Sequence, residues 1–161
     1  MAKAKSKFRK ARTSSIYRGV ERLLGDLMQI SERIPKSSFG LQSVGARMIN
    51  EAMEALAATE YALNSPDLNQ RIMYIGALIH SMTIVKSCCR QVYAYSRKDS
   101  RSTANTDGEI KIVSTPTYGR IISNAQYANL LVTFGKLSME TGKWFKASQT
   151  ARLKVMGNVS M

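Results

Sequence analysis

Two basic residues, Lys86 and Arg90, lie four positions apart in a segment with helical periodicity, and no acidic residue lies within one turn of either. Residues four apart share one face of an α-helix, so both cations are expected to project from the same surface. Basic side chains without acidic partners bind the phosphates of polyanions and release the counterions condensed there. The chemistry that this pair indicates is therefore phosphate binding.

The two ends of the chain carry most of the remaining positive charge. The sequence has 24 Lys and Arg against 11 Asp and Glu, a net charge of +13. Neither the first 20 residues nor residues 141–161 contain an acid. Such an excess attracts polyanions from a distance. We therefore predict a nucleic-acid-binding surface that comprises Lys3, Lys5, Lys7, Arg9, Lys10, Arg12, Arg18, Lys86, Arg90, Lys143 and Lys146.

The composition also indicates how nucleic acid would be bound. Few aromatic residues interleave with the lysines, which argues against base stacking as the main mode of binding. Contacts to phosphates position a protein on nucleic acid but carry no sequence information directly. Sequence-independent binding of RNA or DNA, held by a larger assembly, is therefore expected.

Residues for catalysis or metal binding are not arranged in any known pattern. The sequence contains no GxxxxGK[ST] loop, GxSxG elbow or HExxH motif, and His80 is its only histidine. The adjacent Cys88 and Cys89 favour neither a zinc site nor a disulfide and are expected to fill a helix interface. Glu51 and Glu54 have no histidine partner and are expected on a solvated face. We predict a protein that is not an enzyme and has no metal or cofactor.

The apolar periodicity predicts four long helices, over residues 15–33, 38–63, 66–96 and 115–148. The first has an apolar stripe at Ile16, Val20, Leu23, Leu27, Ile30 and Ile34. Pro35 must end it, and Ser37 or Ser38 can cap the second helix. Ser65-Pro66 and Thr115-Pro116 are cap-then-proline signatures for the third and fourth helices. The fourth has the expected core positions Tyr118, Ile121, Ile122, Ala125, Ala128, Val132, Met139 and Phe145.

The segments outside these helices are polar or basic. Residues 1–13 lack apolar periodicity and are expected to be a flexible basic arm, and residues 149–161 a frayed basic tail. Residues 97–114 are predicted to be a long loop, although the alternation over 109–114 could add a small strand. Gly135 and Gly142 lower the propensity of the fourth helix, so close packing is expected at both.

Four helices joined by two short turns and one long loop predict an all-α, up-down-up-down four-helix bundle over residues 14–148. No uninterrupted apolar run approaches the ~18–20 residues that cross a bilayer, so no membrane association is expected. The basic N-terminus lacks the apolar region of a secretory signal. The expected location is the cytoplasm.

Several short motifs follow one another in the order seen in a known family. Ile34-Pro35-Lys36 is followed by Gly45-Ala46-Arg47 and then by Ala52-Met53-Glu54-Ala55-Leu56 and Tyr61. Thr115-Pro116 and Gly142-Lys143-Trp144 come later in the chain. Over about residues 14–147 the sequence resembles the accessory variability determinant of diversity-generating retroelements. That family is related to four-helix-bundle proteins encoded in intervening sequences of ribosomal RNA genes.

The resemblance implies a prokaryotic or phage-encoded protein that forms a homopentamer of four-helix bundles. It implies association with a reverse transcriptase and its template RNA, in support of mutagenic complementary-DNA synthesis. The family's pair of arginines four apart corresponds to Lys86 and Arg90, with lysine in place of the first arginine.

Two other functions stay open at this point. The chain could be a stand-alone bundle that binds ribosomal or other RNA without a polymerase partner. It could also lie on a membrane surface through its basic arm, although Phe8 is the only apolar anchor in that arm.

Overall fold

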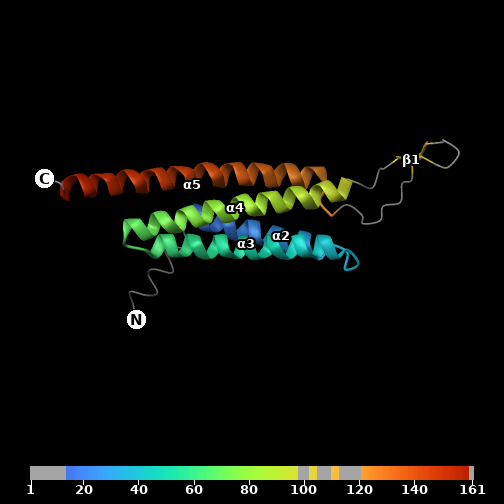
Figure 1. The fold of residues 1–161 in the computed structure, drawn as a ribbon, viewed down its shortest axis with the longest axis horizontal. Helices are drawn as coiled ribbons and strands as arrows, with labels where there is room; N and C mark the ends of the chain where they lie inside the picture. The colour runs from blue at the N-terminus through green and yellow to red at the C-terminus, as the bar shows by residue number, and fades with distance from the viewer. Residues whose placement is uncertain (1–13, 98–101, 105–109, 113–120, 160–161) are drawn as a thin grey trace.

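The computed structural model describes residues 14–97, 102–104, 110–112 and 121–159. Within these ranges the chain forms four helices, α2 (Ser15–Glu32), α3 (Phe39–Asn64), α4 (Leu68–Arg97) and α5 (Asn124–Val159). Consecutive helices run in opposite directions, and α5 packs against both α4 and α2, which closes the ring (Figure 1). The predicted all-α, up-down-up-down four-helix bundle is confirmed. The arm predicted over residues 1–13 lies outside the described residues.

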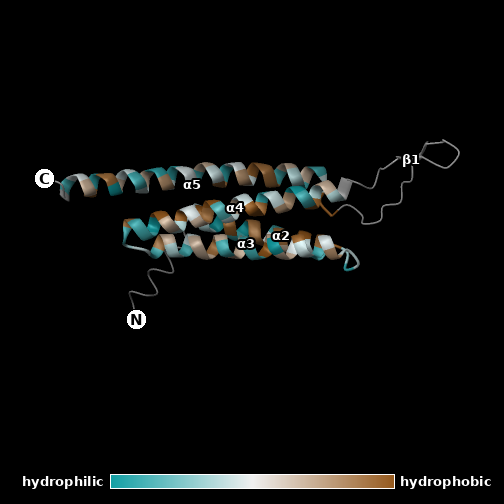
Figure 2. Ribbon diagram, in the orientation of Figure 1, coloured by the Kyte–Doolittle hydropathy of each residue, from teal (hydrophilic) through white to brown (hydrophobic). Residues whose placement is uncertain are grey.

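The core lies along the bundle axis, where the inner faces of the four helices meet. Apolar and polar residues alternate along each helix, as amphipathic helices require (Figure 2). The stripe predicted for α2 is confirmed, because Val20, Leu23 and Leu27 are fully buried and Ile30 is nearly so. The other helices contribute Leu41, Met48, Leu78, Val85, Cys89, Val92, Leu130, Phe134 and Leu137 to the same core.

The apolar stripe predicted for the last helix is correct at Ile121 and Ile122, which are buried, and wrong farther along the helix. Val132 and Met139 are 72% and 57% exposed, whereas Leu130, Phe134 and Leu137 are buried. These three residues have spacings of four and three, which is an equally good helical pattern on another face of α5. Two apolar faces compete in this segment, and the choice between them depends on where α2 and α4 lie.

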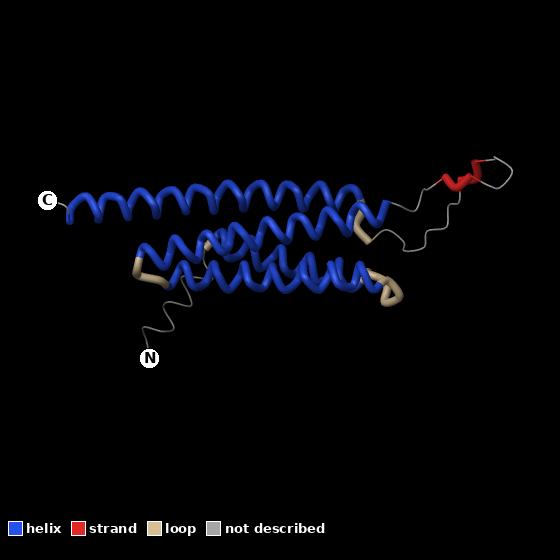
Figure 3. Tube along the Cα trace, viewed as in Figure 1, coloured by secondary structure: helices blue, strands red, loops and turns tan. Residues whose placement is uncertain are grey.

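Short turns at opposite ends of the bundle join α2 to α3 and α3 to α4 (Figure 3). At the first turn, Gln42 Nε2 donates to the carbonyl oxygens of Ile34 and Pro35 at 3.0 and 3.2 Å. These bonds satisfy carbonyl groups that Pro35 leaves at the end of α2. Ser38 occupies the N-cap position of α3, as predicted, but its side chain forms no capping hydrogen bond.

Capping differs from the prediction at α4 and α5. Asp67, rather than Ser65, accepts from a first-turn amide of α4, with 3.1 Å between its Oδ1 and the nitrogen of Asn69. Helix α5 begins at Asn124, so Ile121 and Ile122 are buried but not helical. The predicted start at Thr115-Pro116 lies outside the described residues.

Ser123 and Gln126 form a capping box at the start of α5. Ser123 Oγ accepts from the Gln126 amide at 3.1 Å, and Gln126 Oε1 accepts from the Ser123 amide at 3.2 Å. Gln126 Oε1 also accepts from Arg33 Nη1 at 2.9 Å, which connects the end of α2 to the start of α5.

Helix α5 continues to Val159, so the expectation of a frayed tail from residue 149 is wrong over 149–159. The C-terminal end of α5 extends past the α3–α4 turn (Figure 1). Ala151, Arg152, Leu153 and Lys154 are strong helix formers, which sustain the helix where packing is sparse.

The segment between α4 and α5 contains two short strands, β1 (Ser102–Ala104) and β2 (Ile110–Ile112). They pair antiparallel, with Thr103 opposite Lys111. The prediction of a loop is therefore wrong at these residues, and the small strand considered as an alternative is present.

One described helix passes a simple test for a membrane span. From Leu68 to Tyr95, α4 is long and apolar enough to cross a bilayer, on length and composition alone. We based the sequence expectation on uninterrupted apolar runs only, and small and hydroxyl residues interrupt this one. Because those residues carry no charge, the segment as a whole is still apolar enough. In the structure the apolar residues Leu78, Val85 and Val92 of this helix belong to the bundle core.

Candidate nucleic-acid interface

Charge is divided between the two halves of the bundle. Helix α4 contains no acid, and Glu140 is the single acid of α5. Together α4 and α5, the basic helix pair, contain Arg71, Lys86, Arg90, Arg97, Lys136, Lys143, Lys146, Arg152 and Lys154. Helices α2 and α3 contain the basic residues Arg18, Arg22 and Arg47 and the acids Glu21, Asp26, Glu32, Glu51, Glu54 and Glu60. Because α4 and α5 are neighbours, one half of the bundle is strongly positive. The other half is close to neutral, because Arg33 and Lys36 between α2 and α3 offset most of its excess of acids.

Lys86 and Arg90 are exposed on α4, four residues apart as predicted. Within the described part of the chain, neither side chain forms a hydrogen bond or an ion pair. The prediction that these cations are surface groups without acidic partners is therefore confirmed. Two such cations, about 6 Å apart along the helix axis, can contact neighbouring phosphates.

Lys143 and Lys146 are exposed on α5 and lie farther along the basic helix pair. Tyr93 stacks on Tyr127 with ring centroids 3.9 Å apart, which fixes the antiparallel register of α4 and α5. In this register Lys86 is level with Phe134, so Lys143 lies about 13 Å farther along α5. The predicted cations therefore form a row along the bundle rather than one cluster.

Sequence reasoning missed Lys136, which is exposed on α5. Lys136 and Lys143 are seven residues apart, which is two helical turns, so they share a face. Lys154 lies eleven residues beyond Lys143, on the same side of α5. From the level of Arg90 to Lys154 the row measures about 35 Å. The seven-residue spacing from the predicted residue Lys143 could have identified Lys136 from the sequence.

Arg18 lies in a different place. It is exposed on α2 and lines a groove of about 360 Å³ between α2 and α5, together with Arg22, Lys136 and Glu140. Glu140 Oε2 accepts from Ser15 Oγ at 3.3 Å, so the single acid of α5 is directed towards α2. Arg18 and Lys136 thus lie on the α2 side of α5, away from Lys86 and Arg90 on the α4 side. The predicted residues Lys3, Lys5, Lys7, Arg9, Lys10 and Arg12 lie outside the described residues.

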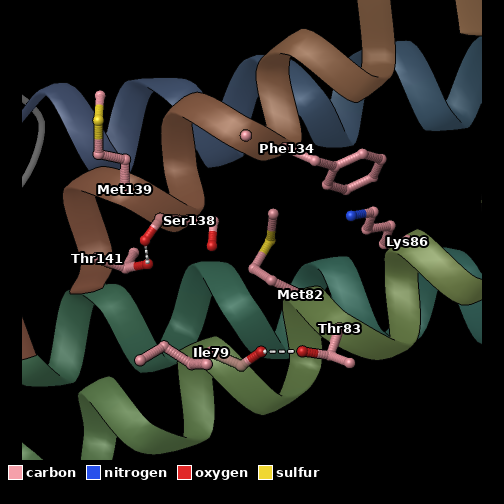
Figure 4. Close-up of a pocket in the computed structure, with 9 residues that line it drawn as sticks. Ile79, Met82, Thr83, Lys86, Phe134, Ser138, Met139 and Thr141 are labelled. Carbon is pink, nitrogen blue, oxygen red and sulfur yellow. Dashed lines mark hydrogen bonds between the residues drawn. The ribbon is translucent and has the colours of Figure 1, made fainter.

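A second groove, of about 430 Å³, lies between α4 and α5. Its lining from α4 is Ile79, Met82, Thr83 and Lys86, and its lining from α5 is Phe134, Gly135, Ser138, Met139 and Thr141. Figure 4 shows the ammonium group of Lys86 directed into the space between the helices, on the same side as the Phe134 ring. The groove therefore has an apolar floor and a cation at one end.

Neither cysteine is poised to act as a nucleophile. Burial raises the pKa of the Cys89 thiol to about 12, and the neighbouring Cys88 adds to the increase. Burial also raises the pKa of Cys88, although Arg47 on α3 opposes that shift. Thiols are reactive as thiolates, so both residues remain inert at neutral pH. Among the described residues, no group of three His, Cys, Asp or Glu side chains could hold a metal ion.

Comparisons with known proteins add no further information. No protein-family model, curated protein or solved structure matches this chain.

Proposed function

We propose that this protein is a non-enzymatic nucleic-acid-binding subunit whose basic helix pair holds phosphate backbones. The observation that carries this proposal is the separation of charge between the two halves of the bundle. An even distribution of the same residues would keep the molecule soluble, but it would give no preferred surface. A row of cations about 35 Å long suits an extended polyanion.

Binding on this surface follows from counterion release. Each cation that neutralises a phosphate releases a condensed counterion, so affinity falls steeply as the salt concentration rises. Lys86, Arg90, Lys143 and Lys146 supply exposed positive groups on a rigid support. Lys3, Lys5, Lys7, Arg9, Lys10 and Arg12 add a second set of cations to the same role.

We further propose that the protein serves as an accessory subunit of a retroelement reverse transcriptase. In this role it holds template RNA and complementary DNA beside the polymerase, works as a homopentamer in a prokaryotic or phage-infected cytoplasm, and uses no cofactor or membrane. The support for this finer proposal is the resemblance in Ile34-Pro35-Lys36, Gly45-Ala46-Arg47 and Gly142-Lys143-Trp144. The exposed pair Lys86 and Arg90, on a helix without acids, is in accord with it.

Co-purification tests the finer proposal. A tagged full-length chain expressed with the reverse transcriptase and template RNA of a diversity-generating retroelement should retain both at low salt. Its mass in solution should be that of a pentamer. Retention of RNA without the polymerase would favour a stand-alone RNA-binding bundle. Failure to retain either would contradict both versions.

A further inference from the structure

We infer that the groove between α4 and α5 receives one unstacked base of a single-stranded nucleic acid while Lys86 contacts the adjoining phosphate. The inference deepens the proposed function and rests on it, because it concerns the same basic helix pair. It changes the expected ligand from any phosphate backbone to a strand whose bases are free to leave the stack.

The groove lies beside two positively charged side chains, which is the first reason for this inference. Lys86 lines it, and Arg90 lies one turn farther along the same helix. The other eight lining residues are uncharged, and α4 contains no acid. A ligand in the groove therefore meets positive charge at one end and no opposing negative charge from α4. This arrangement complements an anionic group attached to an uncharged body.

The floor of the groove suits a flat ring. Met82 on α4 and the exposed Met139 on α5 line the groove beside the buried Phe134, and the thioether of methionine makes favourable contacts with aromatic rings. A volume of about 430 Å³ falls in the range of small-ligand pockets. Thr83 and Thr141 already donate their hydroxyls to the carbonyls of Ile79 and Leu137. A ring in the groove thus needs few polar contacts, which favours stacking over base-specific recognition.

Gly135 lines the groove without a side chain. A Cβ at this position would meet no heavy atom within 4 Å, so the glycine is not required by the packing of the bundle. Glycine has a low helix propensity, so an exposed glycine there lowers the stability of α5, and no close contact in the bundle requires it. Gly142 has the same open surroundings but does not line the groove, so the two glycines form a matched pair for testing it.

The test compares two probes of equal length and phosphate content. One is a fluorescent oligothymidylate, and the other is its abasic counterpart, which retains the sugar-phosphate backbone. The full-length protein should bind the oligothymidylate about tenfold more tightly at low salt, the low end expected for apolar stacking of a base. Gly135→Leu, which fills the groove, should abolish this preference and leave binding of the abasic probe unchanged.

Gly142→Leu is the matched control. Gly142 lies seven residues along the same helix, is exposed, and is also free of neighbours, but it does not line the groove. This variant should keep the tenfold preference. Ser138→Leu, a second groove substitution, serves if Gly135→Leu does not fold. Thermal unfolding and helical circular dichroism establish folding for each variant.

The outcomes separate this inference from the proposed function. Equal affinity of the wild type for the two probes overturns the inference, and salt-sensitive binding of both then leaves the proposed function intact. A preference that survives in folded Gly135→Leu and Ser138→Leu, or that is lost equally in Gly142→Leu, also overturns it. Binding of neither probe at low salt overturns the inference and the proposed function together.

Discussion

Gly45 and Ile34 pack so closely that a Cβ on Gly45 would lie 2.6 Å from Cδ1 of Ile34. Ile34 is 4% exposed, so its terminal methyl group has little room to move. This contact holds the start of α3 against the end of α2 at the corner around Pro35. The two residues belong to the motifs on which the family resemblance rests, and the structure gives them a packing role.

Gly45→Ala is therefore expected to destabilise the bundle. The substitution gains up to ~1 kcal/mol of helix propensity, but overpacking a core contact costs ~1–3 kcal/mol. The free energy of unfolding in urea should fall by about 1 kcal/mol. Ile34→Val removes the clashing methyl group and should rescue Gly45→Ala in the double variant. Strictly additive effects in this cycle would show that the two side chains do not compete for space.

Gly142→Ala should have the opposite effect. A Cβ at Gly142 or Gly135 meets nothing within 4 Å, so the close packing expected at both glycines from the sequence is wrong. The substitution should raise the free energy of unfolding by up to ~1 kcal/mol through helix propensity alone. Urea unfolding measures the gain, and a loss of stability would reveal a close contact at this position.

Gln126→Ala should lower stability by about 1–2 kcal/mol, because Gln126 Oε1 accepts from both the Ser123 amide and Arg33. The substitution removes the hydrogen bond from the Ser123 amide in the capping box and the hydrogen bond from Arg33 that connects α2 to α5. Gln29→Ala, at an exposed glutamine of α2, is the control and should change stability by less than ~0.5 kcal/mol. Similar losses in the two variants would contradict this role for Gln126.

Stability should decline at alkaline pH in part through Cys89. Its pKa is about 12 in the folded protein and 9.0 for an ordinary cysteine, so the unfolded chain loses this proton first. The contribution is fully present below about pH 9 and is lost progressively as the pH rises from about 9 towards 12. Cys89→Ala should therefore lose less unfolding free energy than the wild type between pH 8 and pH 10.5. An identical pH dependence in the two proteins would argue against this burial.

The sequence was sufficient for the helices but not for every helix face. The stripe of α2 was predictable because its apolar residues define a single face, from Val20 to Ile30. In α5 the apolar residues Val132 and Met139 compete with Leu130, Phe134 and Leu137, and only the neighbouring helices decide which set is buried. The start of α5 was not predictable, because Ser123 rather than a proline signature supplies its cap.

The candidate interface was likewise predictable only in part. Lys86 and Arg90 were predictable because their spacing and the lack of nearby acids can be read from the sequence. The separation of charge was predictable as well, because consecutive helices of an up-down-up-down bundle are neighbours. The groove could not be predicted, since it depends on which side chains of α4 and α5 meet, such as Lys86 and Phe134.

Removal of two charges from each half of the bundle tests the central claim most directly. In Lys86→Gln/Arg90→Gln the basic helix pair loses two cations, and in Arg22→Gln/Lys36→Gln the α2–α3 half loses the same number. The affinity for a single-stranded oligonucleotide is measured over a series of salt concentrations. We predict that the first variant weakens binding and reduces the salt slope by about one to two, whereas the second leaves both nearly unchanged. Equal losses in the two variants would show that only the net charge matters, which would contradict a nucleic-acid surface on α4 and α5.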